Sequence, residues 1–85
     1  MYLLHYKIMV ICIYKIVCLN PDIKECYIGS TKNLRMRKIA HKSSCNNINS
    51  KIYNKKIYNF IRENGGYPNW EYEILEEFKE YNKLN

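Results

Sequence analysis

Apolar and polar positions along the chain change periodicity from one segment to the next, and the first segments predict strands. Residues 10–19 are dense in β-branched and aromatic side chains, which favours a buried strand. Turn-forming residues follow at 20–22, and a second short run covers residues 25–29. Two strands joined by so short a polar stretch predict an antiparallel hairpin, with Tyr14 and Tyr27 on neighbouring strands.

Two helices are expected after this hairpin. The small polar residues 30–33 suit a loop and a helix N-cap, and residues 34–42 are good helix formers. A loop rich in serine and asparagine at 43–49 separates this helix from a second one, expected from residue 50 or 51 to residue 64, where a glycine pair ends it. Side chains on the apolar face of the second helix recur at helical spacing, at Tyr53, Ile57, Phe60 and Ile61.

The last segment with a clear pattern is a third strand. Residues 70–74 alternate large apolar with acidic side chains, which is typical of a half-buried strand, and we expect Glu76 and Glu77 to end it and face water. The order β-β-α-α-β predicts an α+β fold, a small antiparallel three-stranded sheet flanked by helices. A chain of 85 residues allows one domain, expected over residues 8–85 after a short extension at residues 1–7.

Charge is distributed unevenly along the chain. The formal net charge is +6, and the segment from residue 32 to residue 56 contains basic residues but no acid. A local positive field of this kind favours a polyanionic partner, and we expect DNA, although a solvated helix face is the simpler alternative. The residues expected to contact nucleic acid are Lys32, Arg35, Lys38, Lys42, Lys55 and Lys56.

The cysteines and the apolar N-terminal stretch limit the other possible classes. The four cysteines lack the close C-x-x-C spacing of zinc sites, so we expect buried free thiols; this spacing disfavours the alternative of a zinc module that uses the cysteines and His41. The uninterrupted apolar run from Ile8 to Tyr14 is far shorter than the ~20 residues of a membrane-spanning helix. Without a convincing signal peptide, we expect an intracellular protein that does not enter a membrane.

Four polar side chains between residues 14 and 41 are candidates for chemistry on a phosphodiester: Tyr14, Tyr27, Arg37 and His41. Arg37 and His41 are four residues apart and so share one helical face. A guanidinium pairs with phosphate oxygens at any working pH, while histidine and tyrosine can transfer protons. Tyrosine has an ordinary pKa near ~10, so Tyr14 would need a nearby positive charge or a metal to act as a base. Each residue alone also has a structural explanation; the joint spacing favours a site.

The same residues carry a resemblance to a known family. Cys12-Ile13-Tyr14 and Tyr27-Ile28-Gly29-Ser30, followed by Asn33-Leu34, Arg37 and His41, resemble the motifs of GIY-YIG nucleases, and the resemblance covers roughly residues 11–77. It implies that Tyr14 is the general base or orients the water, that Tyr27 orients phosphate or water, that Arg37 stabilises the developing charge and that His41 accepts the Tyr14 proton. Cys12, Ile13, Ile28 and Gly29 would be structural. Cys12 replaces the first glycine of the motif, and we expect activity to tolerate it.

The resemblance also implies Mg²⁺ or another divalent cation, held in the family by a glutamate on a helix beyond the third strand. Glu76, Glu77 and Glu80 follow the strand too closely to be that ligand, so we expect a domain cut short before this helix is complete. The leading hypothesis is a DNA endonuclease that works by metal-assisted water attack, of a kind common in viral or mobile elements. The alternative is a catalytically inactive remnant that binds nucleic acid.

Overall fold

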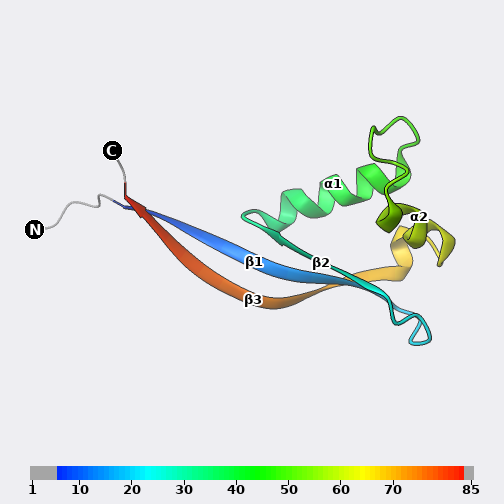
Figure 1. Cartoon of the computed structure of the whole chain (residues 1–85), viewed down its shortest axis with the longest axis horizontal. Helices are drawn as coiled ribbons and strands as arrows, with labels where there is room; N and C mark the ends of the chain where they lie inside the picture. Colours follow the sequence, from blue (N-terminus) through cyan, green and yellow to red (C-terminus); the bar gives the residue numbers. More distant parts are fainter. Residues whose placement is uncertain (1–5, 84–85) are drawn as a thin grey trace, which may run out of the picture.

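A three-stranded antiparallel sheet with two helices makes up the fold (Figure 1). The computed structural model describes residues 6–83, and the side chains of residues 8–81. This order of elements confirms the expected α+β class. In chain order the elements are β1 (Tyr6–Cys18), β2 (Cys26–Thr31), α1 (Leu34–Asn46), α2 (Lys56–Glu63), a short 3-10 turn η1 (Tyr67–Asn69) and β3 (Trp70–Lys83).

Strand β1 lies at the centre of the sheet, between β2 and β3. It is the most apolar of the three strands, which suits the central position because a central strand has neighbours on both edges. The antiparallel register puts Tyr14 opposite Gly29, and Ile16 opposite both Tyr27 and Tyr72. These pairs therefore point to the same face of the sheet.

The core forms where α1 and α2 pack on that face. Alternate β1 residues are buried there, and α1, α2 and the start of β3 supply the remainder of the core. Figure 1 shows both helices on the same side of the sheet, next to its β2 end. The buried apolar residues are Cys12, Tyr14, Ile16, Cys45, Tyr58, Ile61 and Trp70.

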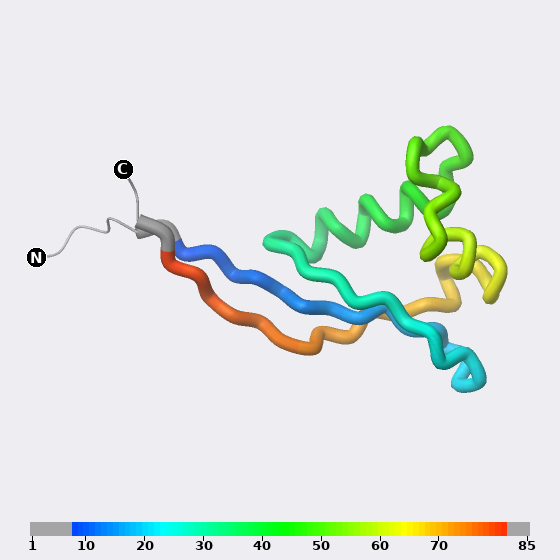
Figure 2. Tube along the Cα trace, viewed as in Figure 1, coloured from blue at the N-terminus to red at the C-terminus, as the bar shows by residue number. Residues whose placement is uncertain are grey.

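Beyond this core, β1 and β3 continue as a two-stranded ribbon. Strand β2 pairs only with residues 12–17 of β1, whereas β3 pairs with β1 back to Tyr6. Figure 2 shows this ribbon extending away from the helices, and the molecule measures 56 × 30 × 17 Å. Ile8, Val10 and Tyr81 are exposed along it.

The strands are longer than the sequence pattern predicts. Of the expected extension, residues 1–5 lie outside the described residues, but Tyr6 and Lys7 belong to β1. Strand β3 does not end at residues 76–77 but runs to Lys83, although Glu76 and Glu77 do face water as expected. The reason is pairing: β1 offers β3 a continuous ladder of backbone partners, and the charged side chains of β3 remain solvated. A register shift between Ile13 and Tyr14 accommodates one extra β3 residue.

Helix α1 is longer than the sequence pattern predicts, and helix α2 is shorter. Helix α1 continues to Asn46, which carries Cys45 into the core. Helix α2 begins only at Lys56, because the preceding residues form turns held by their own side chains. The Asn47 side-chain oxygen accepts a hydrogen bond from the Asn49 amide, and the Ser50 hydroxyl accepts one from the Ile52 amide. Tyr53, expected on the α2 face, lies in these turns, with its ring centroid 3.6 Å from the Arg62 guanidinium carbon.

No helix within residues 6–83 has the length and apolar character needed to cross a membrane.

Candidate active site

A buried chain of hydrogen bonds links the sheet to both helices. The Tyr14 hydroxyl of β1 lies 2.7 Å from Nε2 of His41 on α1, and Nδ1 of the same imidazole lies 2.8 Å from the Tyr58 hydroxyl on α2. All three residues are buried, Tyr14 completely. Both nitrogens of the imidazole therefore have a hydroxyl partner, which fixes the ring in the core.

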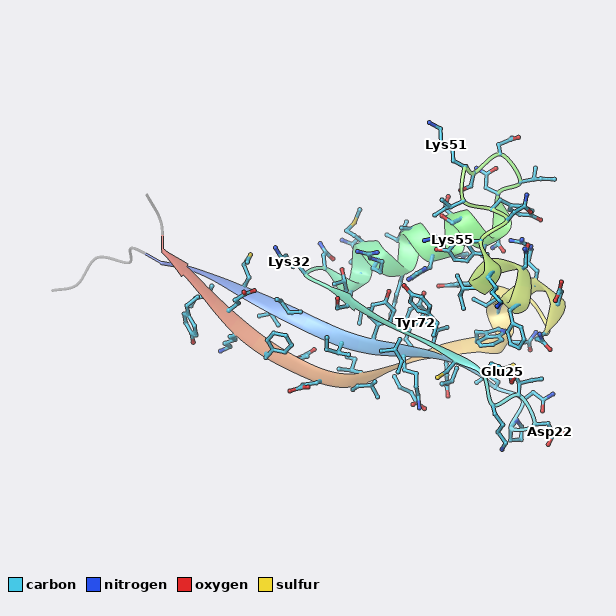
Figure 3. All side chains as sticks on the ribbon, in the orientation of Figure 1. Asp22, Glu25, Lys32, Lys51, Lys55 and Tyr72 are labelled. Carbon is cyan, nitrogen blue, oxygen red and sulfur yellow. The ribbon has the colours of Figure 1, made fainter. Side chains whose placement is uncertain are left out.

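Two further tyrosines enclose the imidazole. The ring centroid of Tyr27 lies 5.6 Å from that of His41 and 6.2 Å from that of Tyr14. Tyr72 of β3 packs against Tyr14 at 5.7 Å, and its hydroxyl lies 3.0 Å from the Tyr67 hydroxyl. Figure 3 shows Tyr72 between the sheet and α1, where the Lys38 ammonium stands 5.0 Å from its ring centroid. The site is thus an aromatic cluster built from all three strands and both helices.

Gly29 is the residue that gives the Tyr14 ring its space. A Cβ atom at position 29 would lie 2.6 Å from the Tyr14 hydroxyl oxygen and 2.8 Å from a ring carbon of Tyr27. Both distances are far below van der Waals contact, and both neighbours are rings held in place by packing. Only glycine at position 29 therefore leaves the two tyrosines where the structure has them.

Burial sets the protonation of the cluster. It raises the pKa of Tyr14 to about 12, with the neighbouring Tyr27 phenol adding to the rise and the Arg37 charge opposing it. Burial also lowers the pKa of His41 from its ordinary value of 6.5, and the positive charges of Arg37 and Lys55 lower it further. At neutral pH, Tyr14 is therefore a phenol and His41 a neutral imidazole able to accept its proton.

Arg37 lies at the solvent side of the cluster. Helix α1 begins after Asn33, whose side-chain oxygen accepts a hydrogen bond from the Met36 amide at 3.0 Å. This start places the exposed Arg37 one turn before the buried His41. Arg37 and Lys32 line a surface hollow of about 400 Å³ together with Ser30 and Thr31. The charge of Arg37 influences both Tyr14 and His41, so the four residues proposed from the sequence do converge on one region.

The basic residues proposed as nucleic-acid contacts are all exposed: Lys32, Arg35, Lys38, Lys42, Lys55 and Lys56. They are distributed over α1, the loop before it and the start of α2. Two of them reach the cluster itself, since Lys38 stacks on Tyr72 and Lys55 lowers the pKa of His41.

The sequence pattern misses Tyr58 and Tyr72 as members of the site. The alternating pattern predicts Tyr72 only as an apolar position of a strand. Tyr58 follows Ile57 on α2, and its position next to the apolar face of that helix was the one signal that could have marked it as buried. Neither has a motif around it, because both join the cluster through tertiary contacts.

The cysteines agree only in part with the expectation of buried thiols. All four are free, and Cys12 and Cys45 are buried. Cys18 is half-buried, with its thiol 3.7 Å from the Asn64 carbonyl oxygen, and Cys26 is exposed because it opens β2 at the edge of the sheet.

A divalent cation such as Mg²⁺ prefers oxygen ligands, carboxylates above all. Among the residues that the structure describes, no group of three or more His, Cys, Asp or Glu has the arrangement of a metal site. The cluster offers tyrosine hydroxyls but no carboxylate among the charges that act on Tyr14 and His41. The described residues therefore do not by themselves fit such an ion.

Comparison with protein families returns one result. The model of the GIY-YIG catalytic domain matches residues 10–85, which is most of the chain and includes every motif residue of the cluster. Neither the comparison with curated proteins nor that with solved structures returned a match. The extent of the family match and the meeting of both motif tyrosines at one buried histidine lead to the same conclusion: the chain belongs to the GIY-YIG family of nuclease catalytic domains.

Proposed function

We propose that this chain is an endonuclease that hydrolyses phosphodiester bonds of DNA, with Tyr14, Tyr27, Arg37 and His41 as its catalytic residues. The observation that carries the proposal is the 2.7 Å hydrogen bond between the Tyr14 hydroxyl and Nε2 of His41. It supplies an otherwise weakly acidic phenol with a buried proton acceptor.

The hydrogen bonds support a proton relay from water to His41. The relay uses the tautomer in which the Tyr14 hydroxyl donates its proton to Nε2 and the neutral imidazole carries its own proton on Nδ1, donated to the Tyr58 oxygen. Tyr14 has no exposed surface, so the relay requires that substrate binding let the attacking water reach its hydroxyl. As this water passes a proton to the Tyr14 oxygen, the original Tyr14 proton moves to Nε2. The relay needs no free phenolate, so the raised pKa of Tyr14 does not prevent the reaction.

Arg37 and Tyr27 serve the phosphate in this proposal. The exposed guanidinium can donate two parallel hydrogen bonds to phosphoryl oxygens and stabilise the charge that develops on them. The Tyr27 ring is half-buried, with its centroid 5.6 Å from that of His41, and in this proposal its hydroxyl orients the phosphate or the water.

The family resemblance adds a requirement for Mg²⁺ or another divalent cation. Such an ion would lower the pKa of the attacking water and help the leaving oxygen. Since no group of three or more His, Cys, Asp or Glu in the described part of the chain is arranged as a metal site, none of the proton steps above depends on an assigned metal ligand.

Nicking of supercoiled plasmid DNA in the presence of Mg²⁺ tests the proposal. We expect Tyr14→Phe to lower the rate by about 100-fold or more, since general base catalysis contributes that much, and Arg37→Ala by a similar factor. Tyr81→Phe and Lys51→Ala are matched controls, because both residues are exposed and lie away from the cluster. Salt-sensitive DNA binding without nicking, whatever the metal supplied, would instead favour the inactive nucleic-acid-binding form.

A further inference from the structure

An apolar pocket adjoins the aromatic cluster, between β2 and the first turn of α2. It has a volume of about 510 Å³, within the range of small-molecule sites. Its walls are Tyr27 of β2, Ile57 and Phe60 of α2, and Trp70 at the start of β3. Lys55 and Lys56 stand at its rim together with Glu25.

Two aromatic rings in the pocket are fixed by their surroundings. Phe60 and Trp70 meet edge to face, with centroids 5.9 Å apart and planes at 76°. The Trp70 indole also donates a hydrogen bond to the Asn64 carbonyl oxygen at 3.1 Å, and the residue is only 7% exposed. The pocket thus has an ordered aromatic wall against which a planar ligand could pack.

The pocket and the cluster share a wall. The Tyr27 ring lines the pocket and also packs against His41, with the centroids 5.6 Å apart. Lys55 stands at the rim, and its charge acts on the His41 imidazole. A ligand in the pocket would therefore lie next to the place where a scissile phosphate must sit.

We propose that this pocket receives one unstacked nucleobase of the DNA substrate, while Lys55 and Lys56 hold the adjoining phosphates. Aromatic walls stack on the face of any base, and a cationic rim complements the backbone that carries it. The Glu25 carboxylate at the rim can accept a hydrogen bond from a base N–H. The inference rests on the proposed function, and it adds that DNA with an unpaired nucleotide is a better substrate than uniform duplex.

Binding of short oligonucleotides in the presence of a chelator tests the pocket independently of cleavage. The chain has a single tryptophan, Trp70, so its fluorescence reports on this one place. We expect a short oligothymidylate to quench this fluorescence to saturation. An oligomer with the same number of phosphates but with abasic sugars should bind more weakly and leave the fluorescence unchanged. Equal affinity and equal quenching by the two oligomers would overturn the proposal.

Three substitutions sharpen the test. Phe60→Leu keeps an apolar side chain but removes a stacking surface, and we expect it to weaken oligothymidylate binding roughly tenfold, with little effect on the abasic oligomer. Lys56→Glu should weaken the binding of both oligomers. Lys51→Glu makes the same charge change in the outer loop between the helices, away from Lys55 and the pocket (Figure 3), and should weaken binding less than Lys56→Glu. Equal effects of the two lysine substitutions would contradict a role for the rim.

The outcome separates this inference from the proposed function. Base-dependent quenching in a protein that never nicks DNA would support the pocket and reject the nuclease. Nicking by a protein that binds abasic and base-bearing oligomers equally well would support the nuclease and reject the base-binding pocket. If Phe60→Leu loses its folded circular dichroism spectrum, the comparison of oligomers with the unchanged protein still decides the matter.

Discussion

At the scale of single residues, the site depends on an imidazole that is buried among hydroxyl groups. Inside a protein a polar group without a partner is costly, and His41 avoids this cost only because Tyr14 and Tyr58 occupy both of its nitrogens. The same burial keeps His41 neutral and Tyr14 protonated, which is the starting state that a proton relay needs.

Gly29→Ala tests how closely the backbone must approach this pair. The added methyl group would meet the Tyr14 hydroxyl oxygen, and we expect the ring to be displaced and the protein destabilised by about 1–3 kcal/mol. Urea unfolding measures the change, and plasmid nicking should fall with it. Lys51→Ala, at an exposed position in the loop between the helices, is the control. A Gly29→Ala protein with unaltered stability and nicking would contradict the observed packing.

The pH dependence of stability tests the pKa shifts of His41 and Tyr14; burial also raises the pKa of Cys45, Tyr58 and Tyr72. The folded pKa of His41 lies below its ordinary value of 6.5, so the unfolded chain takes up the proton first, and stability falls as the pH drops through 6.5. The folded pKa of Tyr14, about 12, lies above its ordinary value of 10.0, so stability is lost as the pH rises from 10 toward 12.

Thermal melts across this range should therefore show a plateau between pH 6.5 and 9.0, because above 9.0 the unfolded chain also loses the proton of Cys45, whose pKa burial raises. His41→Gln should lower the melting temperature at every pH. It should also flatten the slope of melting temperature against pH between about pH 5 and 7, because an unperturbed histidine titrates at ~6.5 and this substitution removes it. An unchanged slope in the His41→Gln protein would show that another group titrates there.

The residues found from the sequence are those with a motif around them. Tyr14, Tyr27, Arg37 and His41 could be placed together because strand pairing and a four-residue helical spacing are local rules. Tyr58 and Tyr72 could not, because their part in the site depends on how α2 and β3 pack on β1. The pocket beside Tyr27 likewise exists only in the assembled fold.

At the scale of the elements, helix α1 presents Arg37 and His41, and its start is set by one cap. The order of elements followed from periodicity, but the boundaries did not. Side-chain hydrogen bonds of Asn47 and Ser50 replaced the expected first turns of α2. Strand propensity predicts that β3 ends at Glu76 and Glu77, but backbone pairing with β1 extends the strand to Lys83.

Asn33→Ala tests the contribution of the cap. Loss of the hydrogen bond from the Met36 amide should cost about 1 kcal/mol of folding stability and fray the turn that carries Arg37. We therefore expect a lower melting temperature and a reduced nicking rate. Asn33→Asp keeps an oxygen acceptor at the cap and should restore both, whereas equal loss in the two variants would argue against capping as the cause.

At the scale of the whole molecule, stability is concentrated where the helices cover the sheet. The ribbon formed by residues 6–11 and 78–83 has backbone pairing, but its described side chains contribute nothing to the buried core. Amide hydrogen exchange should therefore be faster in this ribbon than at residues 12–17 of β1, which pair on both edges. Equal protection along the full length of β1 would mean that another surface covers the ribbon.

Hydrolysis of DNA by this chain would need the sheet and both helices together, and plasmid nicking measures it. Purified protein with Mg²⁺ should convert supercoiled DNA to the nicked form. Chelation, Tyr14→Phe or Arg37→Ala should each abolish that conversion nearly completely, while Tyr81→Phe nicks at the normal rate. Nicking that survives both Tyr14→Phe and Arg37→Ala would show that neither side chain is catalytic.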